Sequence, residues 1–218
     1  MKESFLHARQ RVWQCATRMW RAGLVVGSAG NISMRIPEEP GLAAVTPTAI
    51  EYEFMRAEEV GIVRIEDGAV VDAICGPTSE MPMHLAVLRA RADLGAIVHT
   101  HSPYVSVLSV LRKPLPPVID EMVLYFGGTV EVAEYAVAGS EELGENVVRA
   151  LGESSSVILA NHGNVCTGSD LDEALHVAIS MESCARVYVE AMRSGEPVVL
   201  PEAAIRRLRA LHESRRRG

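Results

Sequence analysis

Three histidines follow short apolar segments, and their placement would suit a metal ion. His99 and His101 are separated by one residue and come directly after Ala96-Ile97-Val98. If that segment is a strand, alternate side chains point to the same side, so both imidazoles face one point. His162 follows a second apolar segment and precedes a glycine. It would complete a three-histidine face with open positions for substrate oxygens, unless it is a loop histidine that bonds only to the backbone.

The other candidate metal ligands of the chain are weaker. Neutral imidazole suits zinc, nickel, copper or iron. A thiolate site is not supported, because the four cysteines are far apart and form no CxxC pair: Cys15, Cys75, Cys166 and Cys184. That usage is typical of reduced packing residues rather than of a disulfide framework. His84 and His176 fall inside segments with a helical pattern, and we interpret them as packing or surface residues.

Polar residues in front of an apolar helix make a second candidate site. Thr78 or Ser79 could cap that helix, and Glu80 would favour its positive N-terminus. The same residues could instead act on a ligand, because free N–H groups at a helix start bind anions. The two hydroxyls would then add donors for a phosphate, and Glu80 could be a base beside the metal.

A glycine-rich loop could bind the same anion. Gly27-Ser28-Ala29-Gly30-Asn31 offers backbone donors, although most such loops are only turns. It has neither the Gly-Lys-Ser/Thr of a P-loop nor GxGxxG spacing, which argues against a nucleotide-binding site. Glu121 lies in Ile119-Asp120-Glu121-Met122, and the pattern alone leaves it as either a surface acid or a functional one.

Composition bounds the class of protein. The 218 residues are 48% apolar and 22% charged, which predicts one globular domain over residues 1–218 with a sizeable core. The net charge of -7 argues against a nucleic-acid partner. No apolar run approaches the roughly 20 residues needed to cross a bilayer, and the polar N-terminus resembles no signal peptide, so we expect a cytoplasmic protein without a membrane partner. The basic stretch at about 205–218 is interpreted as a solvated helix end or tail.

The elements that position these residues mix helices with strands. Helical spacing is expected over residues 4–22, 79–91, 103–111, 140–151 and 170–194, and strands over 32–36, 42–45, 96–98 and 157–160, with a hairpin turn at Asp67-Gly68. Several strands neighbour one another early in the chain, and regular βαβ alternation is absent. The pattern predicts an α/β layered fold with a mixed or antiparallel sheet.

The order of these motifs resembles the class II aldolase/adducin family over roughly residues 5–195. The matching segments are Gly30-Asn31-Ile32-Ser33 with Arg35, Thr46-Pro47-Thr48 with Tyr52-Glu53, Ser79-Glu80, His99-Thr100-His101, Gly127-Gly128 and His162-Gly163. Each motif alone is unspecific, but together and in this order they are highly specific. The resemblance implies a three-layer α/β/α sandwich on a mostly antiparallel central sheet. It also implies a cyclic homotetramer with sites at subunit interfaces.

Roles by position are implied by the same resemblance. Zinc would be bound by three imidazoles, those of His99, His101 and His162. Three imidazoles beside a carboxylate would also accept manganese, iron or cobalt. Glu80 matches the catalytic acid/base of the aldolases, and Ala49 stands where they have glycine. The substrate phosphate would be bound by Asn31, Thr48, Thr78 and Ser79, with Ser28 close by.

One position departs from the aldolase pattern. Aldolases of this family have a tyrosine, donated by a neighbouring subunit, where this chain has Glu121. That tyrosine protonates the aldehyde oxygen, and Tyr125, four residues on, could replace it. Dehydratases of the family carry a catalytic glutamate in a similar Glu-Met context, which favours a functional Glu121. They are not expected to keep Glu80, so its presence here favours carbon–carbon bond chemistry.

These features together predict a metal-dependent aldolase. It would cleave a phosphorylated ketose similar to L-fuculose 1-phosphate, giving dihydroxyacetone phosphate and an aldehyde through a metal-stabilised enediolate. The alternatives are a dehydratase, decarboxylase or 4-epimerase of a related sugar phosphate. A non-catalytic interaction domain of the adducin type is expected to lack the metal ligands, whereas this chain has all three imidazoles and Glu80.

Overall fold

Eight strands form one sheet in the computed structural model, which describes residues 2–217, with side chains through Ser214. The strands are β1 (Asn31–Ile36), β2 (Glu39–Val45), β3 (Gly61–Arg64), β4 (Val70–Asp72), β5 (Ala96–Thr100), β6 (Val132–Ala133), β7 (Ser156–Leu159) and β8 (Asn164–Gly168). Their order across the sheet is β4-β3-β2-β1-β5-β8-β7-β6. Neighbouring strands are antiparallel except β6 and β7, which are parallel. The sheet is therefore mixed, and the predicted α/β class with a mostly antiparallel sheet is confirmed.

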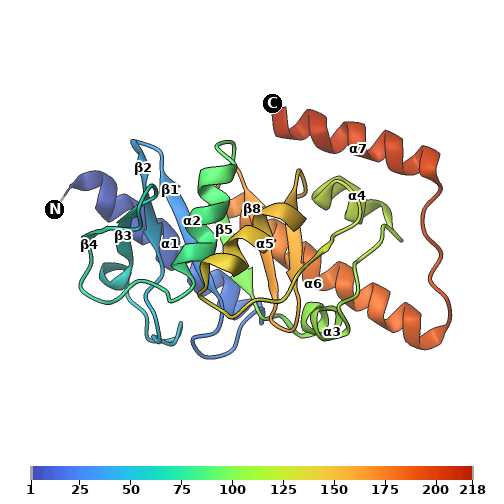
Figure 1. Ribbon diagram of the computed structural model, residues 1–218, viewed down its shortest axis with the longest axis horizontal. Coiled ribbons are helices and arrows are strands. Elements are labelled where there is room, and N and C mark those ends of the chain that lie inside the picture. The colour runs from blue at the N-terminus through green and yellow to red at the C-terminus, as the bar shows by residue number, and fades with distance from the viewer. Residues whose placement is uncertain (1, 218) are drawn as a thin grey trace.

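Helices cover both faces of this sheet (Figure 1). They are α1 (Glu3–Arg21), the 3-10 turn η1 (Ala57–Glu59), α2 (Met81–Ala90), α3 (Pro103–Leu111), α4 (Asp120–Phe126), α5 (Glu141–Leu151), α6 (Leu171–Ser194) and α7 (Glu202–Arg217). The five helices expected from periodicity are present, with ends within two residues of the predicted ones. Ser140 and Asp170 cap α5 and α6 by accepting hydrogen bonds from backbone N–H groups three residues on.

Alternating side chains of the strands feed two separate cores. On one face, Ile32 and Met34 of β1 and Val98 of β5 pack with residues of α1 and α6. On the other face, Val45 of β2 and Ile97 of β5 pack with residues of α2 and α5. Because both faces are covered, the predicted three-layer α/β/α sandwich is also confirmed.

The central pairing of β1 with β5 brings the glycine-rich loop to the histidines. Asn31 is the cross-strand partner of His99. Gly30, directly before it, has a φ of +74°, and a Cβ there would lie 2.6 Å from the carbonyl oxygen of His99. The buried Tyr52 holds the loop from the other side, since its hydroxyl donates to the Gly30 carbonyl at 2.6 Å. Only glycine combines this positive φ with the absence of a Cβ that would meet the His99 carbonyl.

The C-terminal segment, interpreted as a solvated helix end or tail, is the helix α7, and it packs against α4 instead of being fully solvated (Figure 1). Its own residues Ile205 and His212 are buried, and Arg209 donates a hydrogen bond to the Gly127 carbonyl at 2.9 Å. The apolar and polar anchors at helical spacing explain why the segment folds. The side chains of Arg215, Arg216 and Arg217, part of the predicted basic cluster, lie outside the described residues.

No helix in the described part of the chain combines the length and the apolar character that a bilayer crossing requires.

The close approach at Gly30 makes a stability prediction with an internal control. Gly30→Ala should lower the free energy of unfolding by roughly 2–4 kcal/mol, because the methyl group meets the His99 carbonyl in addition to the cost of a left-handed alanine. Gly23 has a similar φ of +73°, but no described atom lies within 4 Å of a Cβ there. Gly23→Ala should therefore cost only about 1 kcal/mol. Urea denaturation measures both values, and equal losses would contradict the steric argument.

Candidate active site

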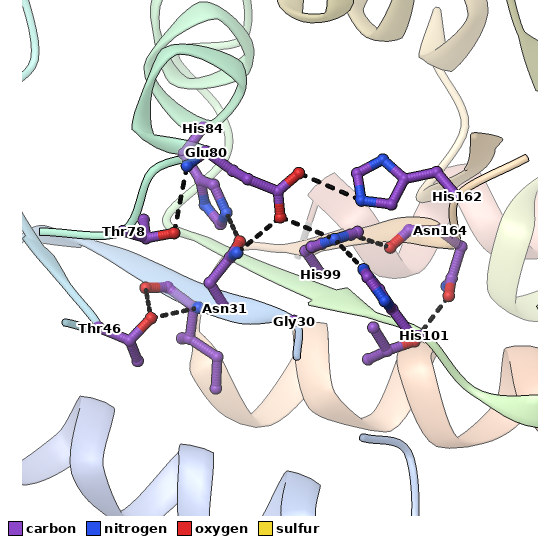
Figure 2. Close-up of polar contacts among 12 residues, drawn as sticks. Gly30, Asn31, Thr46, Thr78, Glu80, His84, His99, His101, His162 and Asn164 are labelled. Carbon is purple, nitrogen blue, oxygen red and sulfur yellow. Dashed lines mark hydrogen bonds and ion pairs between the residues drawn. The ribbon is translucent and has the colours of Figure 1, made fainter. Parts of the chain in front are cut away.

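Four side chains from separate parts of the chain meet at one end of the central strands (Figure 2). His99 belongs to β5 and His101 follows it, while His162 lies in the turn between β7 and β8. Glu80 immediately precedes α2. Each of the four offers a ligand atom, and these atoms all lie within 4.8 Å of one another. The structure therefore brings together the three predicted imidazoles and Glu80.

The polar atoms of this cluster are directed at one another. Glu80 Oε2 lies 3.0 Å from His99 Nε2, and Glu80 Oε1 lies 3.2 Å from His162 Nε2. His99 Nε2 is also 2.9 Å from His101 Nε2. The three rings have centroid separations of 4.8 to 4.9 Å and interplanar angles of 70° to 79°. The imidazoles thus surround one point from three directions.

The backbone selects the tautomer of His99. Its Nδ1 lies 2.9 Å from the carbonyl oxygen of Asn164, which can only accept, so Nδ1 carries the proton. With the proton on Nδ1, it is Nε2 that can present a lone pair toward the cluster. Asn164 is held in turn, because the Thr100 hydroxyl donates to its Oδ1 at 2.6 Å. Support of this kind is typical around histidines that bind metals.

Burial sets the charge states of the cluster. It lowers the pKa of His101 to about 4 and that of His162 to about 4, and the nearby His99 acts in the same direction. Burial works against ionisation of Glu80, but hydrogen bonding to His99 and the charge of a protonated His99 outweigh it, so the pKa of Glu80 lies below its usual range. At neutral pH Glu80 is therefore ionised, and it faces neutral imidazoles of His101 and His162.

A cation fits this arrangement of acceptors. Among the described atoms, the buried Glu80 Oε1 has no hydrogen-bond partner, because His162 Nε2 is near it but not in hydrogen-bonding geometry. A buried oxygen without a partner costs about 1–3 kcal/mol. A proton could relieve only one of these contacts, whereas a divalent ion could accept lone pairs from all four residues. Three imidazoles and a carboxylate suit zinc, manganese, iron or cobalt.

His84 belongs to the same site, contrary to its interpretation as a packing or surface residue. It is fully buried in the first turn of α2, and its Nε2 lies 2.5 Å from Asn31 Oδ1. Asn31 in turn donates from Nδ2 to Glu80 Oε2 at 2.8 Å (Figure 2). Burial lowers the pKa of His84 to about 3, so the ring is neutral. Its spacing from Glu80 is the local signal that could have linked His84 to the site, since residues four apart share a helix face.

Comparison with known proteins gives the family. Residues 10–189 match the family model described as the class II aldolase and adducin N-terminal domain. The chain belongs to the class II aldolase/adducin family. It is 35% identical over 194 residues to the 5-deoxy-D-ribulose 1-phosphate aldolase of Bacillus thuringiensis, covering 89% of this chain and 90% of that protein. An L-fuculose phosphate aldolase of Escherichia coli is 33% identical, with 88% and 86% covered.

A solved structure of an L-fuculose 1-phosphate aldolase has the same fold. It superposes with a TM-score of 0.90 at 33% sequence identity, and the match covers 95% of this chain and 96% of the other. The chain therefore shares its complete architecture with an aldolase of the class II aldolase/adducin family. Class II aldolases are metal-dependent, which agrees with the Glu80 and histidine cluster.

The loops expected to bind phosphate lie beside Glu80. Pro47 and Pro77 form an isolated bridge, and the Thr78 N–H donates to the Thr46 carbonyl at 2.9 Å. This pairing places Thr48 next to the segment that leads into α2. The side chains of three of the predicted contacts are exposed, namely Ser28, Thr48 and Ser79, while Asn31 and Thr78 are buried.

The start of α2 differs from the predicted cap and anion site. The helix begins at Met81, and the Glu80 side chain is turned to the histidines instead of capping it. The backbone N–H of Glu80 donates to Thr78 Oγ1 at 3.3 Å, that of Met81 donates to the Thr78 carbonyl, and Pro82 has none. Because these donors are used or missing, a phosphate here would depend on hydroxyl groups. Asn31 could add only its second amide N–H, since its other polar contacts are made to Glu80 and His84.

Ala49 occupies a backbone conformation that explains the glycine found there in aldolases of the family. Its φ is +56°, in the left-handed region. An alanine in this region costs roughly 1–2 kcal/mol, which glycine avoids. The turn after Thr48 therefore has a conformation that glycine adopts without strain, and Ala49 adopts it at a cost in stability.

Glu121 and Tyr125 are not brought to the cluster within one chain. Both lie on α4, and the Tyr125 ring stacks edge-on against His176 of α6 with centroids 4.8 Å apart. Glu121 is exposed, and its charge adds to the effect of burial, which raises the pKa of Cys184 on α6. Among the contacts of the described residues, neither side chain reaches Glu80.

Metal content tests the proposed ligands directly. His99→Ala should reduce the metal bound per chain, measured by elemental analysis after dialysis, at least about tenfold, because it removes one of three imidazole ligands. His7→Ala, at an exposed position of α1, serves as the control and should retain the metal. Unchanged metal content in folded His99→Ala would contradict the site.

Proposed function

We propose that this protein is an aldolase that cleaves a ketose 1-phosphate into dihydroxyacetone phosphate and an aldehyde. The observation that carries the proposal is the placement of the Glu80 carboxylate. One oxygen is held by Asn31, and the other is buried without a hydrogen-bond partner among the described atoms, beside three imidazoles. A carboxylate in that position can exchange a proton with a bound substrate, as the reaction requires.

His99, His101 and His162 would hold a divalent ion, for which we propose zinc. Such an ion would supply Lewis-acid stabilisation of the negative charge that develops on the substrate oxygens. The protein supplies the remaining chemistry. Asn31 directs the Glu80 carboxylate. Glu80 would then move a proton between the carbon and the oxygen of the enediolate, which becomes dihydroxyacetone phosphate.

The phosphate loops would fix the substrate against this carboxylate. Ser28, Thr48 and Ser79 have exposed side chains, and Thr48 and Ser79 lie near the start of α2, where a phosphate at carbon 1 would be held. Holding the phosphate positions the reacting carbons, which is where much of the rate enhancement of such an enzyme arises. We propose a ketose with a short apolar end, because the similar proteins named above act on 5-deoxyribulose and fuculose phosphates.

We further propose a cytoplasmic homotetramer in which α4 of a neighbouring subunit completes each site. Glu121 is exposed and remote from the cluster of its own chain, which supports a role in another chain. Either Glu121 or Tyr125 would then exchange the proton of the hydroxyl that becomes the aldehyde. The family pattern, in which a neighbouring subunit donates the group at this position, motivates this assignment.

Replacing the carboxylate tests the proton transfer. Glu80→Gln keeps the size and the contact with Asn31 but cannot take up a proton, so kcat for ketose 1-phosphate cleavage should fall by about 10²–10⁴-fold. Fold and bound metal should remain, as circular dichroism and elemental analysis would show. The wild-type protein must first be screened against 5-deoxyribulose 1-phosphate and L-fuculose 1-phosphate, with products identified by mass.

The outcome of that screen separates the possible reactions. Two carbon fragments support an aldolase, whereas loss of water, loss of CO2 or an inverted carbon would assign a dehydratase, decarboxylase or epimerase. Glu66→Gln, at an exposed position, is the matched control and should retain wild-type kcat. Full cleavage activity in Glu80→Gln would refute the assigned role.

Mixed tetramers test the contribution of α4. Glu80→Gln and Glu121→Gln should each be inactive alone. If Tyr125 is the active group instead, the inactive variant to combine with Glu80→Gln is Tyr125→Phe. After the two inactive chains are unfolded and refolded together, roughly a quarter of the sites would combine both intact residues, and that share of activity should return. If no activity returns although the mixed tetramers form, the two residues do not act between subunits.

A further inference from the structure

His84 connects the sheet to the candidate catalytic carboxylate through an unbroken chain of hydrogen bonds. Its Nδ1 lies 2.7 Å from the hydroxyl of Ser33, and its Nε2 lies 2.5 Å from Asn31 Oδ1. The amide of Asn31 then reaches Glu80 Oε2 at 2.8 Å. All four residues are at most 7% exposed, so water does not compete for these contacts.

The Glu80 carboxylate, at one end of this series of hydrogen bonds, determines which group donates in each of them. An ionised carboxylate only accepts, so Asn31 must present its NH2 group to Glu80. The Asn31 carbonyl oxygen then faces His84, and Nε2 of that ring must donate. A neutral imidazole with the proton on Nε2 has a lone pair on Nδ1, which accepts from the Ser33 hydroxyl. The carboxylate therefore fixes the orientation of the amide, the amide fixes the tautomer of His84, and the Ser33 hydroxyl, which can donate or accept, supports that tautomer by donating to Nδ1.

The elements explain why these four side chains meet. Asn31 and Ser33 are two apart on β1 and point to the same face of the sheet. Glu80 and His84 are four apart at the start of α2 and share one face of that helix. The chain of bonds thus fastens the first turn of α2 to β1. Asn31 is also the cross-strand partner of His99, which places the amide beside the imidazole cluster.

We propose that His84 is a positioning residue that acts through Asn31 to hold the Glu80 carboxylate in its reactive orientation. This inference rests on the proposed function. Without the donor on His84, the Asn31 amide is free to turn and present its oxygen to the carboxylate, which would repel it. Glu80 would then lose the bond that fixes Oε2 and leaves Oε1 directed at the imidazoles.

Two substitutions of His84 separate positioning from simple packing. In His84→Gln the side-chain NH2 reaches the place of Nε2 and can still donate to Asn31. In His84→Asn the shorter amide stays near the place of Nδ1, keeps Ser33 within reach and leaves Asn31 without its donor. Both variants bury a neutral amide, so a merely structural role predicts similar behaviour.

The measurements are Co2+ affinity with its visible absorption spectrum, and kcat for a ketose 1-phosphate cleaved by the wild-type protein. His84→Asn should bind Co2+ about 10–100-fold more weakly, with an altered spectrum, and its kcat should fall by a similar factor. His84→Gln should restore most of the Co2+ affinity and of kcat.

Wild-type values in His84→Asn, or equal losses in both variants, would overturn the proposal. If His84→Asn does not fold, Ser33→Ala replaces it and should weaken Co2+ binding about threefold or more; wild-type binding there would equally overturn the proposal.

A stability control comes from the other end of the sheet. Arg9 is 2% exposed and donates hydrogen bonds to the carbonyls of Val60 and Asp72. Arg9→Met should lower the melting temperature while Co2+ affinity and kcat stay at wild-type values. Losses in Arg9→Met equal to those in His84→Asn would overturn the positioning role. If the wild-type protein cleaves no ketose 1-phosphate, the proposed function fails, and the Co2+ measurements still decide the role of His84.

Discussion

The structure is organised around one constraint, which is the mutual repulsion of the electron-pair donors that meet at the candidate metal site. Three imidazole nitrogens and a carboxylate are held within 4.8 Å of one another, and the protein uses buried supports to keep them there. Asn164 orients His99, and Asn31 orients Glu80. Each support removes a rotation by which the acceptors could avoid one another. The packing of the two cores on either face of the sheet offsets the cost of this arrangement, and a bound positive charge would relieve it.

The site also depends on a close approach between two backbone segments, the loop before β1 and the end of β5. Asn31 can stand beside His99 only because Gly30 lets the loop approach the carbonyl of that residue. The start of α2 shows the reverse trade, since Glu80 leaves the helix end without a side-chain cap so that its carboxylate faces the histidines. Local stability is given up at both places in favour of the site.

Much of this could be predicted from local patterns. Apolar strands ending at His99 and His162 predicted the cluster, and helical periodicity placed α3 and α6 almost to the residue. What failed depends on distant contacts. His84 reads as an ordinary helix residue because its partners, Asn31 and Ser33, are about fifty positions away. Likewise α7 folds against α4 through Arg209 and His212, which no local pattern reveals. The two-residue β6 depends on pairing with β7, and β8 on pairing with both β5 and β7, rather than on their own sequence.

The separation of the four ligand residues along the sequence has a consequence for the turnover of the protein. They come from residue 80 to residue 162 and from separate elements, so the unfolded chain has no comparable site. An ion that binds only the native state shifts the folding equilibrium by mass action, by about 2.7 kcal/mol when its concentration is a hundred times the dissociation constant. The supply of metal in the cell would therefore set how often the chain opens, and with it the rate at which proteases remove the protein.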